Sequence, residues 1–173
     1  MADLLTHVLV AYIFATALSW YVDSITPALV TVAMAGAILP DLNRLEFVLP
    51  ATAVESTLSL PFSWSAFHTL GAAVVVSLLV AALVTPEYRL PVLGLFFLGA
   101  LSHLFTDVFM YNPTGLSGSY LWPFSSHRFA VDGFYRSYDR WPLLLTALVA
   151  TAVWRETRRR AAASRPGPSS PPR

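Results

Sequence analysis

The segment Leu90–Met110 reads LPVLGLFFLGALSHLFTDVFM, and it decides the fold class. It is apolar over the roughly 20 residues that an α-helix needs to cross the hydrocarbon core of a bilayer. Its only ionisable side chains are His103 and Asp107, four residues apart near its end. A segment of this length and composition is typical of a transmembrane helix, so the sequence predicts an integral membrane protein.

The composition of the whole chain supports this prediction. The 173 residues are 55% hydrophobic and 12% charged, which is more apolar and less charged than a soluble domain. Every basic residue is an arginine and the net charge is only +1, so there is no electrostatic argument for binding nucleic acid. The chain has no cysteine, and any bound metal must therefore be held by imidazole and carboxylate groups.

Four further apolar segments flank the first, at Leu4–Val22, Thr26–Leu42, Phe67–Thr85 and Trp141–Trp154. The N-terminal one has no preceding Arg or Lys, so we interpret it as a retained helix and not as a cleaved signal peptide. The last one is short, but its terminal Trp residues resemble interfacial anchors. We therefore expect an all-α polytopic integral membrane helix bundle of about five transmembrane helices.

The remaining segments are connections and a tail. Leu45–Trp64 is broken by prolines, which predicts a re-entrant or interfacial segment. Tyr111–Asp139 is rich in Gly, Pro and Ser and forms the one long irregular loop, between the fourth and fifth helices. We assign residues 1–156 to the transmembrane helical domain and residues 157–173 to a disordered tail rich in Arg, Pro and Ser.

The basic tail predicts the orientation of the chain. Arg-rich segments next to a membrane helix favour the cytoplasmic side, so we expect a multi-pass protein of the plasma membrane with a cytoplasmic C-terminus. Five spans would then place the N-terminus outside. The lipid bilayer is the one predicted partner, and nothing in the sequence indicates an oligomeric state.

Five ionisable residues fall at corresponding depths of the predicted helices: His7, Asp41, His68, His103 and Asp107. In an antiparallel up-and-down bundle they all reach the same membrane face. Ionisable groups are costly in a bilayer, so such residues are candidates for a functional site.

The spacing of His103 and Asp107 gives a second indication. Residues four apart on a helix stand one turn above each other and point the same way, so this pair can share one ion. Imidazole and carboxylate ligands without cysteine suit Zn, Mn or Fe. The five residues together predict a divalent metal site at one membrane face, with either one or two ions.

A metal-activated water at that face would allow hydrolysis of a lipid-like or phosphoester substrate. In this hypothesis Asp41 and Asp107 are the catalytic carboxylates, acting as ligands or as the base. The long loop emerges at the same face, so His127, Arg128 and Trp122 are candidates for binding substrate.

Each residue also has a simpler interpretation. Asp41 suits a solvated turn after Pro40, and His7 and His68 suit interfacial histidines without a ligand role. His103 and Asp107 suit a structural hydrogen-bonded pair. In the loop, His127 and Arg128 suit ordinary solvated side chains and Trp122 an interfacial aromatic belt.

Three other functions are open to the same sequence. An ion-coupled or proton-coupled transporter would use these residues as a pathway, but would need them near the midplane of the membrane. A non-catalytic membrane scaffold would need no site. Gly115–Gly118 matches the Gly-x-Ser-Gly of rhomboid proteases, but Ser117 lies in the polar loop and no histidine follows in the fifth helix.

Several short motifs resemble one family. They are Thr6-His7, Leu39-Pro40-Asp41-Leu42-Asn43, the segment Ser63–Thr69, Leu101-Ser102-His103 through Asp107, and Trp122-Pro123. In this set and order they resemble the YdjM-type membrane-bound metal-dependent hydrolases of bacteria and archaea. The resemblance covers most of residues 4–124, and the block from Leu101 to Asp107 is its most specific part.

The resemblance implies a membrane-bound metal-dependent hydrolase in which His7, Asp41, His68, His103 and Asp107 are ligands. The chain departs from the family pattern at two positions. Asn43 replaces the second acid, and Ser63 replaces the first histidine of the third motif. These departures leave two expectations open, a site for one metal where relatives hold two, or a degenerate site without activity.

Overall fold

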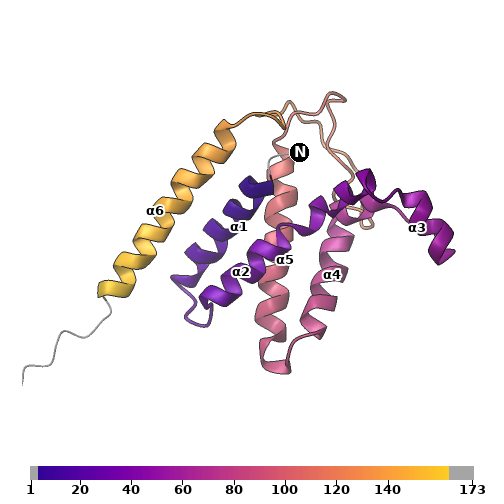
Figure 1. Cartoon of the computed structure of the whole chain (residues 1–173). Helices are drawn as coiled ribbons and strands as arrows, with labels where there is room; N and C mark the ends of the chain where they lie inside the picture. Colours follow the sequence, from indigo (N-terminus) through magenta and orange to yellow (C-terminus); the bar gives the residue numbers. More distant parts are fainter. Residues whose placement is uncertain (1–3, 164–173) are drawn as a thin grey trace, which may run out of the picture.

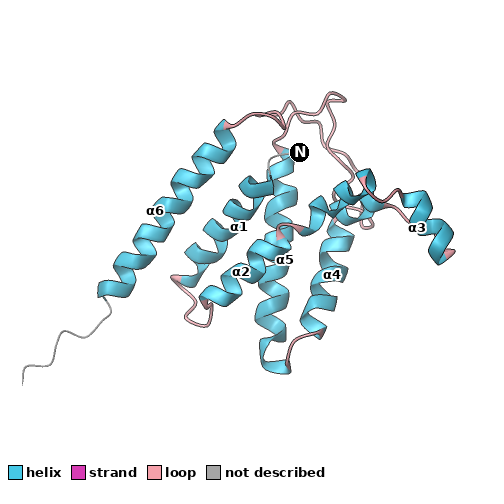
Figure 2. Ribbon diagram, in the orientation of Figure 1, coloured by secondary structure: helices cyan, strands magenta, loops and turns pink. Residues whose placement is uncertain are grey.

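The computed structural model describes residues 4–163, which form helices and loops and contain no strand (Figure 2). The α-helices are α1 (Leu4–Ser19), α2 (Pro27–Gly36), α3 (Ala51–Leu58), α4 (Leu70–Ala82), α5 (Arg89–Val108) and α6 (Trp141–Ala163). Three short 3-10 segments are η1 (Leu39–Phe47), η2 (Trp64–His68) and η3 (Pro86–Tyr88). The predicted all-α class is therefore confirmed.

Helix α5 is the centre of the bundle (Figure 1). It packs against α1, α2 and α4, whereas α6 packs on the outer side of α1. The Trp20 indole N–H that follows α1 donates to the Thr157 hydroxyl of α6 at 2.9 Å. The order of packing is thus α6, α1, then α2 and α5, then α4.

Helices α2 and α5 cross at two glycines. A Cβ added to Gly36 would lie 2.0 Å from the carbonyl oxygen of Phe96, and one added to Gly99 would lie 1.8 Å from that of Ala33. Small residues at such positions let two helix backbones approach closely, as they do between membrane helices. Residues at these positions must lack a side chain for the crossing to form.

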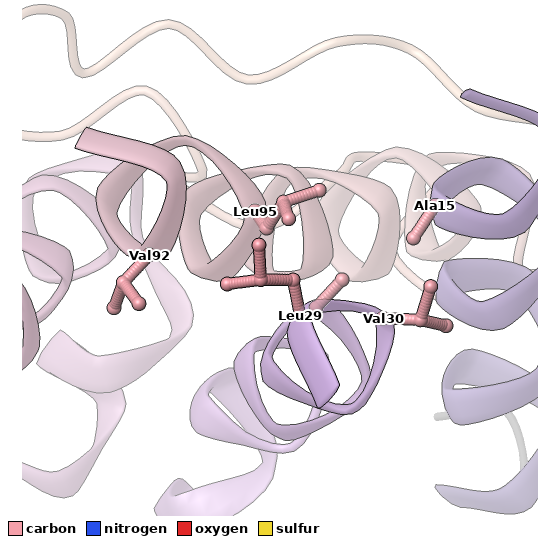
Figure 3. Close-up of a cluster of buried hydrophobic side chains, with 6 residues drawn as sticks. Ala15, Leu29, Val30, Val92 and Leu95 are labelled. Carbon is pink, nitrogen blue, oxygen red and sulfur yellow. The ribbon is translucent and has the colours of Figure 1, made fainter. Parts of the chain in front are cut away.

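Helices α1, α2 and α5 also share a cluster of buried apolar side chains (Figure 3). It joins Ala15 of α1, Leu29 and Val30 of α2, and Val92 and Leu95 of α5. None of these residues carries a polar group, so the N-terminal half of α5 is held by shape and van der Waals contact.

Length and composition mark one helical stretch of the described residues, Pro86–Val108, as able to cross a membrane. Helices α1 and α4 are apolar but shorter, and α6 carries several arginines in its last turns. The prediction of five spans is therefore not confirmed.

The second predicted span is not one straight helix. Helix α2 ends at Gly36, and the chain continues as η1 at an angle of 43°. Pro40 accounts for the break, because it has no N–H to bond the carbonyl of residue 36 and its ring clashes with that carbonyl. Asp41 consequently lies in η1 and not at the end of an α-helix.

The segment predicted as re-entrant or interfacial contains α3, which projects away from the other helices (Figure 1) and has no buried residue. The long loop is irregular as predicted, with two isolated bridges, between Met110 and Tyr135 and between Leu116 and Ala130.

The predicted boundary of the tail differs from the structure. Helix α6 continues past residue 156 to Ala163, where Glu156 pairs with Arg160 at 3.0 Å one turn on. Residues 164–173 of the predicted tail lie outside the described part of the chain.

Candidate metal centre

The five predicted ligands meet at one end of the bundle, and Asp107 lies in their middle. Its Oδ1 is 3.3 Å from His7 Nε2, and its Oδ2 is 3.0 Å from His68 Nε2 and 3.5 Å from His103 Nε2. His7 and His103 are completely buried, and Asp107 is 3% exposed. Three helical segments distant in sequence thus bring three imidazoles to one carboxylate.

His103 is oriented by the close crossing of α2 and α5. Its Nδ1 lies 2.7 Å from the carbonyl oxygen of Ala37. Because a carbonyl can only accept, Nδ1 must carry the proton, and Nε2 of the neutral ring then presents a lone pair to Asp107. The glycines at the crossing therefore also fix the direction of this ring, since Ala37 directly follows Gly36.

His68 is oriented in the same manner. Its Nδ1 lies 3.2 Å from the carbonyl oxygen of Pro40, so Nε2 is again the nitrogen that faces Asp107. The ring lies in η2 directly before α4, whose N-cap is Thr69. The Thr69 hydroxyl accepts from the N–H of Ala72 at 3.3 Å, which begins the helix immediately after the histidine.

His7 reaches the site from α1 by stacking on His103. The two ring centroids are 3.7 Å apart and the planes differ by 12°. Neither ring nitrogen of His7 has a hydrogen-bond partner within the described residues. The stacking leaves His7 Nε2 directed at the same carboxylate.

Asp41 stands at the edge of the group. Its Oδ1 is 3.9 Å from His103 Nε2 and 3.2 Å from Arg44 Nε. It is 7% exposed, and neither of its carboxylate oxygens has a hydrogen-bond partner in the described part of the chain. Asp41 is therefore placed to contact His103 or an ion near it, with the Arg44 guanidinium on its outer side.

This donor set fits a divalent cation. In the neutral tautomers that the Ala37 and Pro40 carbonyls favour, the Nε2 lone pairs of His103 and His68 face the Asp107 oxygens, and His103 Nε2 and both Asp107 oxygens have no hydrogen-bond partner within residues 4–163. Such lone pairs repel one another unless a cation lies between them. Ligand atoms about 2.1 Å from one ion are roughly 3.0–3.4 Å apart, close to the distances measured around Asp107. His7, His103 and Asp107 alone could hold an ion.

A cavity of about 750 Å³ opens over His68 and Asp107. Most of its accessible wall is apolar, but its lining residues include the polar side chains of Asn43, Glu55, Ser63, Thr69 and Tyr120, together with Trp122. Asn43 and Ser63, which stand where the resembled motifs have an acid and a histidine, both line this cavity beside the candidate ligands.

The long loop reaches the cavity through the N-terminus of α4. The N–H groups of Leu70 and Gly71 donate to the carbonyl oxygens of Tyr120 and Trp122, at 2.7 and 2.9 Å. The first amides of a helix have no partner within the helix, so the loop satisfies them. This contact places Tyr120 and Trp122 at the cavity wall.

The other loop residues predicted to bind substrate do not line the cavity. The Arg128 Nε donates to the Ser117 carbonyl at 2.7 Å, and the His127 ring packs edge-on against Phe129. The Ser117 hydroxyl donates to the Gly118 carbonyl and accepts from the Phe129 N–H. These contacts hold the loop together, and they explain the polar residues around Ser117 without a nucleophile.

Sequence reasoning missed Tyr120 and Glu55, which both line the cavity. The Tyr120 ring centroid is 5.4 Å from that of His68, and burial, together with the negative charge of Asp107, raises the pKa of Tyr120 to about 12. The phenol therefore keeps its proton at neutral pH and can donate it in a hydrogen bond. The only sequence signal was the position of Tyr120 two residues before the Trp122-Pro123 motif.

The chain was compared with known proteins and with models of protein families. Searches of the curated proteins and of the solved structures each found no match. The model of one family, described as YdjM inner membrane protein, matches residues 1–165. The match includes every candidate ligand and the loop over the cavity. The chain belongs to the YdjM inner membrane protein family.

Proposed function

We propose that this protein is a metal-dependent hydrolase of the inner membrane that cleaves a lipid-like or phosphoester substrate at one membrane face. The observation that carries the proposal is the set of three imidazoles directed at the buried carboxylate of Asp107, beside a cavity that is open to substrate.

Membership of an inner membrane family supports a multi-pass arrangement. We propose that the five longer helices, all except α3, traverse the bilayer with the C-terminal end of α6 in the cytoplasm. Large apolar side chains are exposed along α6 and α4, including Leu144, Leu148 and Leu78. Contiguous exposed apolar surface is unfavourable in water and suits contact with lipid.

His7, His68, His103 and Asp107 would hold the ion, with Asp41 as a further ligand or as the base. A bound divalent ion supplies a Lewis acid that polarises a scissile carbonyl or phosphoryl oxygen and makes water more acidic. The carbonyls of Ala37 and Pro40 fix which nitrogen of His103 and His68 is available. Such outer contacts orient ligands and tune their basicity.

Tyr120 would act on the substrate side of the site. Its ring lies against His68 on the cavity wall, and its raised pKa keeps the hydroxyl protonated. A protonated phenol can donate to an oxygen on which negative charge develops. The loop that carries Tyr120 also covers part of the site and limits the entry of bulk water.

The placement of the ionisable residues favours hydrolysis over transport. A transporter needs its binding groups near the midplane with access from both sides. Here the candidate ligands lie at the end of the bundle where the long loop also lies (Figure 1), and the cavity over them is walled by that loop and by residues of the η1–α4 region.

Metal analysis of the full-length protein in detergent tests the proposal. We expect about one ion per chain in the wild type and little in His103→Ala or Asp107→Asn, because each removes a ligand atom. The ester p-nitrophenyl decanoate would be hydrolysed by the wild type but by neither of these two ligand variants. His127→Ala is the matched control, since this exposed histidine packs on Phe129 outside the site. Equal metal content in all four proteins, with folding checked by thermal melting, would exclude the centre.

A further inference from the structure

We infer that the substrate is an amphiphile with an uncharged, hydroxyl-bearing head and a hydrocarbon chain, and that the chain lies in an apolar groove along α4. The inference rests on the proposed function for the reaction and names the substrate class. The cavity over His68 and Asp107, with its polar side chains, would hold the head. The groove, of about 590 Å³, would hold the chain.

The groove and this cavity are neighbours that share part of their walls. Pro61, Phe62, Ser63, Ala66 and Trp122 line both. A ligand with its polar end beside His68 can therefore pass these residues and continue into the groove. The junction lies between the η2 region and the loop.

The groove is suited to a hydrocarbon chain. On α4 it follows Gly71, Val75 and Leu79, which are four residues apart and lie on one face of the helix. This face extends for about 12 Å at 1.5 Å per residue. Phe67 and Pro123 line the groove as well, and Ser63 is its one hydroxyl, at the end shared with the cavity. A polar head placed in the groove would have almost no hydrogen-bond partner.

The cavity differs from the groove in its larger share of polar side chains, but none of its described lining residues is an arginine. Among its described lining residues the charged ones are Glu55 and Asp107. The N-terminus of α4 is not available for an anion either, because the loop carbonyls and Thr69 occupy the N–H groups of Leu70, Gly71 and Ala72. A phosphate head would therefore depend on the proposed divalent ion and on neutral hydroxyl donors, without the arginine or free helix N-terminus that normally binds it, and beside the negative charge of Glu55.

Hydroxyl groups do find partners there. The side-chain oxygen of Asn43, a cavity-lining residue, is buried and has no hydrogen-bond partner within the described residues. An unsatisfied buried acceptor is costly, and a rotation of the Asn43 side chain toward the cavity would pair it with a ligand hydroxyl. Ser65, Ser119 and Asn112 add further neutral donors and acceptors to the wall. This chemistry selects a glycerol-like or sugar-like head.

Photolabelling of the full-length protein in phosphatidylcholine nanodiscs tests the inference. The probe is a monoacylglycerol with a diazirine in the middle of its acyl chain. We expect labels on the α4 peptide that contains Val75 and Leu79. Val75→Trp fills the groove and should reduce this labelling about tenfold. Leu78→Trp is the matched control, because Leu78 is equally exposed on α4 but does not line the groove.

Competition with unlabelled amphiphiles tests whether the head of the substrate is uncharged. Unlabelled monoacylglycerol of the same chain length should displace the probe, whereas dodecyl phosphate should not. If Val75→Trp does not reduce the labelling, or if α6 is labelled as strongly as α4, the hydrocarbon chain does not lie in the groove. If dodecyl phosphate displaces the probe, the head of the substrate need not be uncharged. Photolabelling does not require hydrolysis of the probe, so its result is independent of the metal content of the protein. Loss of the metal centre alone would contradict the proposed function and leave the labelling result standing.

Discussion

The two halves of α5 differ in what holds them. The N-terminal half, with Val92 and Leu95, packs into an apolar cluster in which no group has a required direction. The C-terminal half presents His103 and Asp107 to residues whose atoms must meet within a few tenths of an ångström. The comparison shows that one helix can combine a region held by non-directional apolar packing with a region in which single backbone carbonyls decide the geometry.

The two halves are joined by the close crossing at Gly99, which should be the most sensitive point. In Gly99→Ala the new Cβ would meet the Ala33 carbonyl, so α2 and α5 must separate. We expect the free energy of unfolding in detergent to fall by about 3 kcal/mol and metal binding to be lost, because the Ala37 carbonyl moves away from His103. Thermal melting and metal analysis measure both effects.

Gly94→Ala is the control for this prediction. A Cβ at Gly94 meets nothing within 4 Å, so the variant should stay within about 1 kcal/mol of the wild type and keep its metal. Equal behaviour of the two variants would show that the crossing is not what positions the site.

Substitution of Asp41, at the edge of the candidate metal centre, should have a smaller effect on metal binding than Gly99→Ala. Asp41→Asn keeps the shape but removes the charge beside His103, and we expect metal affinity to fall by about 10–100-fold. Titration against a competing chelator measures this change. Glu46→Gln, an exposed acid on the same 3-10 segment, should leave the affinity unchanged. If both variants bind metal like the wild type, Asp41 lies outside the centre.

The smallest effect is expected in the apolar half. Leu95→Met keeps the volume of a buried side chain, so the free energy of unfolding should change by less than about 1.5 kcal/mol. Metal affinity should not change, because no ligand contacts Leu95. A loss of metal in this variant would mean that the two halves are more strongly coupled than their packing indicates.

Part of the site could be predicted from the sequence. His103 and Asp107 lie on one helical face at a spacing of four, which is a local property, and the absence of cysteine restricts the donor types. The apolar segments predicted the helical class and the approximate positions of most helices. The sequence predicted one continuous helix over Thr26–Leu42 and missed the break after Gly36, because the segment stays apolar through Pro40.

Other parts of the site depend on contacts between distant residues. The loop residues His127 and Arg128 were predicted beside the substrate, but contacts with Phe129 and Ser117 hold them elsewhere. Tyr120 was not predicted, because its carbonyl reaches the N–H of Leu70 only once the loop has folded back onto α4. No local pattern specifies such a return.

The sequence by itself determined the apolar helical character, the types of ligand and the shared face of His103 and Asp107, because composition and helical periodicity are local. Only the tertiary structure decided which nitrogens face Asp107, how His7 stacks on His103 and where the cavity opens. Ala37 and His103 are 66 residues apart in the chain, and their hydrogen bond depends on the distance between two helix backbones. That distance follows from the packing of two glycines against carbonyl groups, which becomes defined only when α2 and α5 meet.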